Sequence, residues 1–338
     1  MLSRTAEHLF WMTRHTARAD HLARLLDACY QRSLLPAPDD AAPHAVHAAN
    51  GWLTILSTVG LADHYRLSHR DIEPGEAIAF LAADATNPSS IVSSLRFARE
   101  NARAVRGCLS AELWETLNAT WLDLQRLIAD GLHEHDPYAF FEWVKQRLYL
   151  ARGVQMAAPV QNETSGFLHL GACVERADHM ARTLEAHCDI LQHAFDYHGA
   201  NALLRAVSAH DAYREVYRDA IAPARIAALL IQCQDWPGSL AASVEDIRRL
   251  AVRLRNGQSA QTERLASQLC EEVRQAPLHE WFAGGFASGF ASGFASTQGS
   301  VALRAWLVAL IARVNELARR VGRDLVRPAI PEPVAAAA

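Results

Sequence analysis

Apolar residues recur at intervals of three to four along nearly the whole chain, whereas no segment shows the strict alternation of a half-buried strand. This spacing predicts amphipathic helices, which end at glycine and proline. The predicted helices of the first half cover residues 3–32, 46–65, 75–84, 88–107, 110–130 and 138–158. Those of the second half cover residues 164–195, 200–219, 223–233, 237–255, 259–274 and 299–322. We therefore expect an all-α protein, folded as a multi-helix bundle.

Two distant segments of the chain repeat each other. RADHLARLL at 18–26 and RADHMARTL at 176–184 agree at seven of nine positions, four of which carry a charge or an imidazole. Each is followed by a helix start with proline and serine, NPSSI at 87–91 and WPGSL at 236–240. A repeat of this length indicates an ancient duplication. We expect two pseudo-symmetric helical halves, 1–160 and 161–325, that form one structural unit.

Two segments depart from this pattern. Residues 282–299 (FAGGFASGFASGFASTQG) are of low complexity, and their glycines disfavour a helix. They are interpreted as a surface loop, or as a flexible lid or partner-docking segment, because exposed phenylalanines are costly. Residues 326–338 are expected to be a disordered tail.

Composition excludes several classes of protein. Half of the 338 residues are hydrophobic, which allows a sizeable core, and the net charge of −4 does not favour nucleic acid. The six scattered cysteines form no Cys-x-x-Cys motif, so we expect free thiols in a reducing compartment. Charged residues interrupt the opening MLSRTAEHLFWMTRH, which predicts no signal peptide, and no apolar stretch is long enough for a membrane span. A cytoplasmic protein is expected.

The charged side chains of the first long helix fall on two edges. On a wheel advancing about 100° per residue, Arg18 borders the apolar stripe. Asp20 and Arg24 fall opposite, as a pair one turn apart. The edge beside the stripe carries Arg4, Glu7, Arg14 and Arg18.

The second copy repeats this geometry. Arg176 borders an apolar stripe, whereas Glu175, Asp178 and Arg182 are placed on the far face. Arginines beside an apolar stripe need partners. One interpretation is a symmetric ion-pair network where the two long helices cross. The other is a groove in which guanidinium groups bind a carboxylate or phosphate. Position 17 is alanine where the second copy has Glu175, so Arg176 is the better candidate for a site.

A third candidate lies at the Pro-Ser helix start of the first half. Asn87, Ser89 and Ser90 combine two hydroxyl groups with the free N–H groups of a helix N-terminus, which can bind an anion. Arg99 and Glu100 follow on the same predicted helix. The structural alternative is that the first three cap the helix and that the charged residues form a solvated face.

The sequence contains no motif typical of a metal site, a nucleotide site or a serine hydrolase. There is no His-Glu-x-x-His motif among the sixteen histidines, and His133-Glu134-His135-Asp136 precedes proline in an expected loop. Phosphate loops, dinucleotide fingerprints and Gly-x-Ser-x-Gly elbows are missing as well. We expect no metal and no cofactor, and no residue is assigned a catalytic role.

Four segments together resemble the alpha-E domain proteins, a bacterial α-helical family with a characteristic Glu-Arg motif. The resemblance spans about residues 1–255 and places that motif at Glu175-Arg176. Ala17 and the Phe-Ala-Ser-Gly repeats depart from it. The segments are MLSRTAEHLFWMTRH, NPSSIVSSLRFARENARAVR, ETSGFLHLGACVERADHMARTL, and AYREVYRDAIAP before WPGSL.

The resemblance implies partners. The family is a companion of circularly permuted ATP-grasp ligases and of transglutaminase-like proteases, which suggests a peptide or amide-bond-forming pathway. The first hypothesis is an accessory component that handles an anionic amino-acid or acyl-phosphate intermediate. The second is an enzyme that completes acyl transfer or cyclisation on that intermediate. The third is a purely structural interaction module.

Overall fold

The computed structural model describes residues 2–35, 44–157, 162–191, 196–282 and 297–327. Within these ranges the chain forms helices joined by short turns and contains no strand, which confirms the all-α bundle. Most of the segment 282–299 and most of the tail 326–338 lie outside the described residues, so the interpretations of both stay untested.

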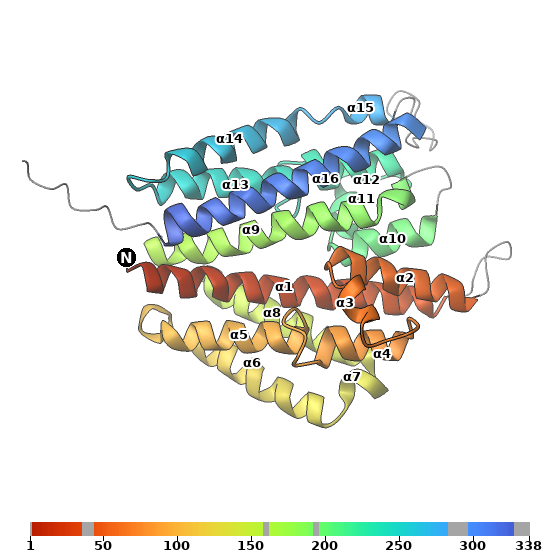
Figure 1. The fold of residues 1–338 in the computed structure, drawn as a ribbon, viewed down its shortest axis with the longest axis horizontal. Helices are drawn as coiled ribbons and strands as arrows, with labels where there is room; N and C mark the ends of the chain where they lie inside the picture. Colours follow the sequence, from red (N-terminus) through yellow and green to blue (C-terminus); the bar gives the residue numbers. More distant parts are fainter. Residues whose placement is uncertain (1, 36–43, 158–161, 192–195, 283–296, 328–338) are drawn as a thin grey trace, which may run out of the picture.

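Two long helices, α1 (Ser3–Ser33) and α9 (Glu163–Ala186), lie side by side along the middle of the molecule (Figure 1). They run in the same direction, because Arg18 contacts Glu175 and His21, further along α1, contacts Thr183, further along α9. The two backbones approach closely at Gly171, where a Cβ atom would collide with the carbonyl group of Phe10. This parallel pair is the junction of the two halves.

The first half builds a four-helix bundle on α1. Helix α5 packs against α1 in the opposite direction, since His8 pairs with Asn101 and His15 lies against Phe97. Helix α8 also runs opposite to α1, with Lys145 of α8 bonded to Asp27 of α1. Helix α6 closes the bundle against α5 and α8. These helices are α5 (Ile91–Ala104), α6 (Ala111–Ala129) and α8 (Pro137–Ala157).

The second half repeats these neighbours around α9. Helix α13 (Leu240–Arg253) and helix α16 (Thr297–Arg320) pack on α9, and α14 (Ala260–Arg274) packs on both. In Figure 1 this bundle lies above α9, whereas α5 and α6 lie below α1. The matching neighbours support the predicted duplication, which stays a prediction. One apolar core contains residues of both halves, from Leu9 of α1 to Leu325.

Shorter elements complete the two halves. Helix α2 (His44–Thr58) follows α1 but also packs on α9, and α10 (Tyr197–Ala206) follows α9 but packs on α1. The chain thereby crosses the junction twice. The remaining helices are α3 (Ala62–Arg66), α4 (Pro74–Ile78), α7 (Leu132–His135), α11 (His210–Tyr217), α12 (Pro223–Gln232) and α15 (Leu278–Trp281). Tighter or wider turns are η1 (Ala79–Ala83), η2 (Arg106–Cys108), η3 (Cys188–Leu191) and η4 (Val321–Val326).

The structure corrects four predicted elements. The expected helix 46–65 is broken at Gly60 and the expected helix 200–219 at Ser208, because both residues adopt the left-handed conformation, with φ of 72° and 60°. The expected helix 164–195 is shorter, since α9 ends at Ala186. The expected loop at His133–Asp136 is wrong, because a single helical turn, α7, begins after the left-handed Gly131.

The two Pro-Ser helix starts have the same internal bonding. Ser90 accepts a hydrogen bond from the N–H of Ser93 (3.1 Å) and donates to the carbonyl of Asp84 (2.7 Å). Ser239 accepts from the N–H of Ala242 (3.0 Å) and donates to the carbonyl of Cys233 (2.5 Å). Both serines are fully buried N-caps. The predicted serine caps are therefore confirmed, but α5 and α13 begin three residues after the predicted starts, and both prolines precede the helix.

Candidate functional site

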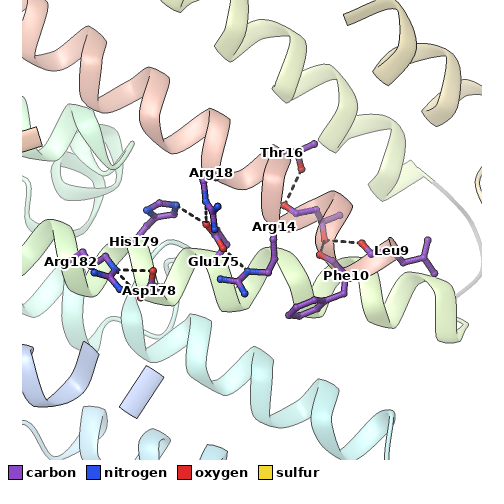
Figure 2. A network of polar contacts seen from close by, with 10 residues as sticks. Leu9, Phe10, Arg14, Thr16, Arg18, Glu175, Asp178, His179 and Arg182 are labelled. Carbon is purple, nitrogen blue, oxygen red and sulfur yellow. Dashed lines mark hydrogen bonds and ion pairs between the residues drawn. The ribbon is translucent and has the colours of Figure 1, made fainter. Parts of the chain in front are cut away.

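A buried carboxylate joins the two halves at the centre of the junction. Glu175 of α9 is 1% exposed and faces α1. Its Oε2 accepts a hydrogen bond from Nε of Arg14 (2.6 Å), and its Oε1 accepts one from Nε of Arg18 (2.7 Å). Figure 2 shows the two guanidinium groups on either side of the carboxylate. We call these three residues the Glu175 cluster.

The sequence places both arginines within reach of one acid. Arg14 and Arg18 lie one helical turn apart, so their side chains leave the same face of α1. The guanidinium of Arg14 also lies over the Trp11 ring, 4.7 Å from its centroid, which adds a cation–π contact. The arginine side chains retain 13% and 23% of their exposure, whereas Glu175 retains almost none.

The charges of the Glu175 cluster do not cancel. Burial alone would raise the pKa of Glu175, but His179, Arg14 and Arg18 beside the carboxylate hold that pKa well below its ordinary value. Glu175 is thus ionised at neutral pH, and the three side chains carry one net positive charge. The terminal Nη nitrogens of both arginines form no hydrogen bond with any residue that the structure describes. Such donors are available to an oxyanion.

Histidines extend the cluster along the junction. Nε2 of His179 lies 3.2 Å from Oε1 of Glu175, and the His179 ring lies 4.2 Å from the ring of His21, its counterpart in the first copy. The ring nitrogen Nε2 of His21 lies 3.0 Å from the Thr183 hydroxyl. Burial, and then neighbouring His179, lower the pKa of His21 well below its ordinary value. His21 is therefore a neutral polar group within the junction.

The structure reverses one sequence prediction for this region and leaves another untested. Glu175 does not lie on the far face of α9 but points into the junction. Arg176, the favoured candidate, is half-buried, and its Nη1 donates to the carbonyl of Pro237 (2.8 Å) before α13, so its role in a site stays a prediction. The wheel failed because it ranks residues by apolar neighbours, and the buried side chain here is a charged one that is partnered by α1. Since position 17 is alanine, no second carboxylate occupies the matching position.

The remaining charged candidates lie outside the cluster. Glu7 pairs with Arg327 of the C-terminal segment, and Arg4 is exposed near the start of α1. Arg99 pairs with Glu100 (2.5 Å) and donates to Asn118. The contact between Arg99 and Glu100 agrees with the solvated-face alternative, whereas Glu7 does not pair with α9 as a network at the helix crossing would require.

At the third candidate, the Pro-Ser helix start of the first half, the polar side chains already form hydrogen bonds within the protein. Asn87 is fully buried, its amide donates to the carbonyl of Phe80 (3.0 Å), and its oxygen accepts from the N–H of Ser89 (3.0 Å). Ser90 caps the helix, as described above. These contacts favour the capping interpretation of all three residues.

The repeated stretch also carries two ion pairs within single helices. Asp20 and Arg24 form the predicted pair one turn apart (2.8 Å), and Arg152 of α8 joins them (3.0 Å). Asp178 and Arg182 form the corresponding pair on α9. The roles of His21 and His179 were not predicted, although both belong to the repeated stretch that could have identified them.

A cavity of about 230 Å³ lies further along the junction, between α1, α2, α9 and α10. Its wall includes Leu25, Ile55, His187 and Leu203 but no residue of the Glu175 cluster. The cavity and the cluster are therefore separate features of the junction. No helix in the described part of the chain combines the length and apolar character needed to cross a membrane.

The fold and the cluster define a class: an all-α protein whose two bundles are joined through a buried Glu–Arg cluster. The chain belongs to the Alpha-E family, described as a predicted alpha-helical domain with a conserved ER motif, and the match covers residues 1–325. This confirms the resemblance found in the sequence. No curated protein and no solved structure matches the chain.

The chain contains two Glu-Arg dipeptides with different environments. Glu175-Arg176 has its acid in the junction, as described. Glu263-Arg264 lies near the start of α14, where Glu263 pairs with Arg255 (2.7 Å) and accepts from Ser259 (2.8 Å). Only the first dipeptide connects the two halves, which favours it as the motif of the family.

Proposed function

We propose that this chain is an accessory component of an ATP-grasp-dependent pathway that forms peptide or amide bonds. In this proposal the Glu175 cluster binds an anionic amino-acid or acyl-phosphate species through Arg14 and Arg18. Glu175 fixes the two guanidinium groups and does not contact the anion. The proposed partner is a circularly permuted ATP-grasp ligase in the cytoplasm, and a transglutaminase-like protease is a second proposed partner.

One observation carries this proposal: two guanidinium groups share a single carboxylate. Each arginine uses Nε for Glu175 and leaves its Nη groups for another acceptor. Guanidinium groups bind carboxylates and phosphates through paired, charge-assisted hydrogen bonds. The remaining positive charge and the partial exposure of both arginines support an anion site of this kind.

The chemistry of the proposed pathway gives such a site a purpose. ATP-grasp ligases activate a carboxylate as an acyl phosphate, which water hydrolyses. A partner that holds the intermediate in a partly buried place excludes some of that water. Arg14 and Arg18 are 13% and 23% exposed, which is partly buried in this sense.

The test compares Arg18→Lys with a matched control. Lysine keeps the charge at position 18 but loses the planar fork, so we expect about tenfold to hundredfold less product from the reconstituted ligase reaction, measured by mass spectrometry. The control is Arg182→Lys, which alters an arginine that pairs with Asp178 on its own helix. Unchanged product formation by a folded Arg18→Lys variant would refute the proposal.

The burial of Glu175 favours a second candidate function, a structural interaction module. In that case the cluster only orients the two bundles, and the partner binds elsewhere. A module of this kind still copurifies with the ligase when Arg18→Lys is introduced, and it binds no anion. An enzyme that completes acyl transfer would instead consume a supplied acyl phosphate after the ligase is removed.

A further inference from the structure

His15 lies beside the Glu175 cluster with an unsatisfied ring nitrogen. The residue follows Arg14 and precedes Arg18 by three positions on α1. Its ring lies between those of Trp11 (5.6 Å) and Phe97 of α5 (5.2 Å). Nδ1 is buried and has no hydrogen-bond partner among the described residues. An imidazole without such a partner is unusual in a packed interior.

The charges around His15 come from three helices. Arg14 and Arg18 of α1 oppose a further positive charge, and Glu175 of α9 favours it. From α5 the ring of Phe97 faces His15, and the guanidinium of Arg96 lies over that ring, 5.0 Å from its centroid. Burial and then Arg18 lower the pKa of His15 to about 4, so this imidazole is neutral at neutral pH.

An oxyanion on the two arginines would change this balance. Its negative charge would offset the guanidinium groups that disfavour the imidazolium form of His15. The protonated ring would also add a third donor to the two arginines. Glu175, Arg14, Arg18 and a protonated His15 together carry two net positive charges.

We infer that the Glu175 cluster binds a tetrahedral dianion of the phosphoryl class and that His15 takes up one proton from solvent when the dianion binds. The inference rests on the proposed function, which requires an anion at Arg14 and Arg18. A dianion matches the two net charges of the protonated cluster. A carboxylate, with one charge, matches the cluster with His15 neutral.

The experiment is isothermal titration of the full chain with sulfate and with acetate near pH 6. Sulfate is a tetrahedral dianion that does not titrate in this range. Two buffers of different ionisation enthalpy reveal the number of protons taken up. We expect about one proton per bound sulfate and almost none for acetate. Proton uptake this complete requires that the pKa of His15 in the complex lie about one unit above the pH of the experiment, so sulfate should bind about tenfold more tightly.

Variants separate His15 from the arginines. His15→Gln should abolish proton uptake and weaken sulfate binding about tenfold, while acetate binding is retained. The matched control is His8→Gln on the same helix, whose Nδ1 is already hydrogen-bonded to Asn101 (2.9 Å). This control should keep both sulfate affinity and proton uptake.

Each outcome distinguishes the inference from the proposed function. Equal binding of sulfate and acetate without proton uptake would overturn the inference and leave the anion site standing. Binding of neither anion would overturn both. The wild-type protein supplies a measurement that needs no variant: the NMR pH titration of the His15 ring should move to a higher pKa in sulfate. An unchanged titration would also overturn the inference.

Discussion

The single carboxylate of Glu175 forms ion pairs with two arginines of the other half, Arg14 and Arg18. A lone buried acid would be protonated or would destabilise the fold, but His179, Arg14 and Arg18 keep this one ionised. The reverse also holds, since both guanidinium groups are largely removed from water and depend on Glu175. Loss of the carboxylate therefore destabilises both guanidinium groups, and loss of the guanidinium groups destabilises the carboxylate.

Replacing Glu175 by glutamine should destabilise the protein strongly. The change leaves two partly buried positive charges without their counter-charge, and we expect the free energy of unfolding to fall by about 3–5 kcal/mol. Urea denaturation at pH 7 measures this loss. The control is Glu271→Gln, which removes an exposed pair with Arg274 and should change stability by less than about 1 kcal/mol. Equal effects of the two variants would contradict the prediction.

Only part of this cluster could be predicted from the sequence. The shared edge of Arg14 and Arg18 follows from helical periodicity, because both residues lie on one helix. The partner could not be found in the same way, since it lies 157 residues from Arg18 and nothing in a single wheel ranks Glu175 above Arg176. The capping serines were found because their bonds are local.

At the scale of the helices, the junction depends on how closely α1 and α9 approach. Gly171 allows the contact, because its missing side chain leaves space for the Phe10 carbonyl and the Thr13 hydroxyl. The existence of nearly every helix could be predicted from periodicity. The breaks at Gly60 and Ser208 could not, because the apolar pattern continues across both.

Gly171→Ala should push α1 and α9 apart. The new methyl group would collide with the Phe10 backbone, which cannot move aside as a flexible side chain can, and we expect a loss of about 1–3 kcal/mol in unfolding free energy. Gly153→Ala in α8 is the control, because a Cβ atom there meets nothing within 4 Å. The control should gain about 0.5–1 kcal/mol from the better helix propensity of alanine. Stabilisation by both variants would refute the close approach.

At the scale of the whole molecule, histidines with lowered pKa values lie along the junction of the halves. They are His15, His21 and His187, each kept neutral chiefly by burial. In the unfolded chain a histidine binds a proton below a pH of about 6.5. The folded protein resists that proton, so acid favours the unfolded state.

Stability should therefore fall as the pH drops from about 6.5 toward 4. Within this window the unfolded chain binds more protons than the folded one, and each such histidine contributes up to about 1.4 kcal/mol per pH unit. Urea denaturation at several pH values measures the slope. His15→Gln should make it shallower, whereas His135→Gln, an exposed residue of α7, should not. A flat profile between pH 6.5 and 4 would contradict the burial of these rings.

The distance along the chain between Arg14 and Glu175 also determines how long the arginines exist without their carboxylate during synthesis. The two residues are 161 positions apart, so the arginines leave the ribosome roughly 10–30 s before their carboxylate at ordinary elongation rates. During that interval α1 can gather α5, α6 and α8 around it, but its charged edge has no counter-charge from α9. Until α9 is synthesised, the first bundle therefore exposes the arginine edge of α1, whose charge only the later part of the same chain can compensate.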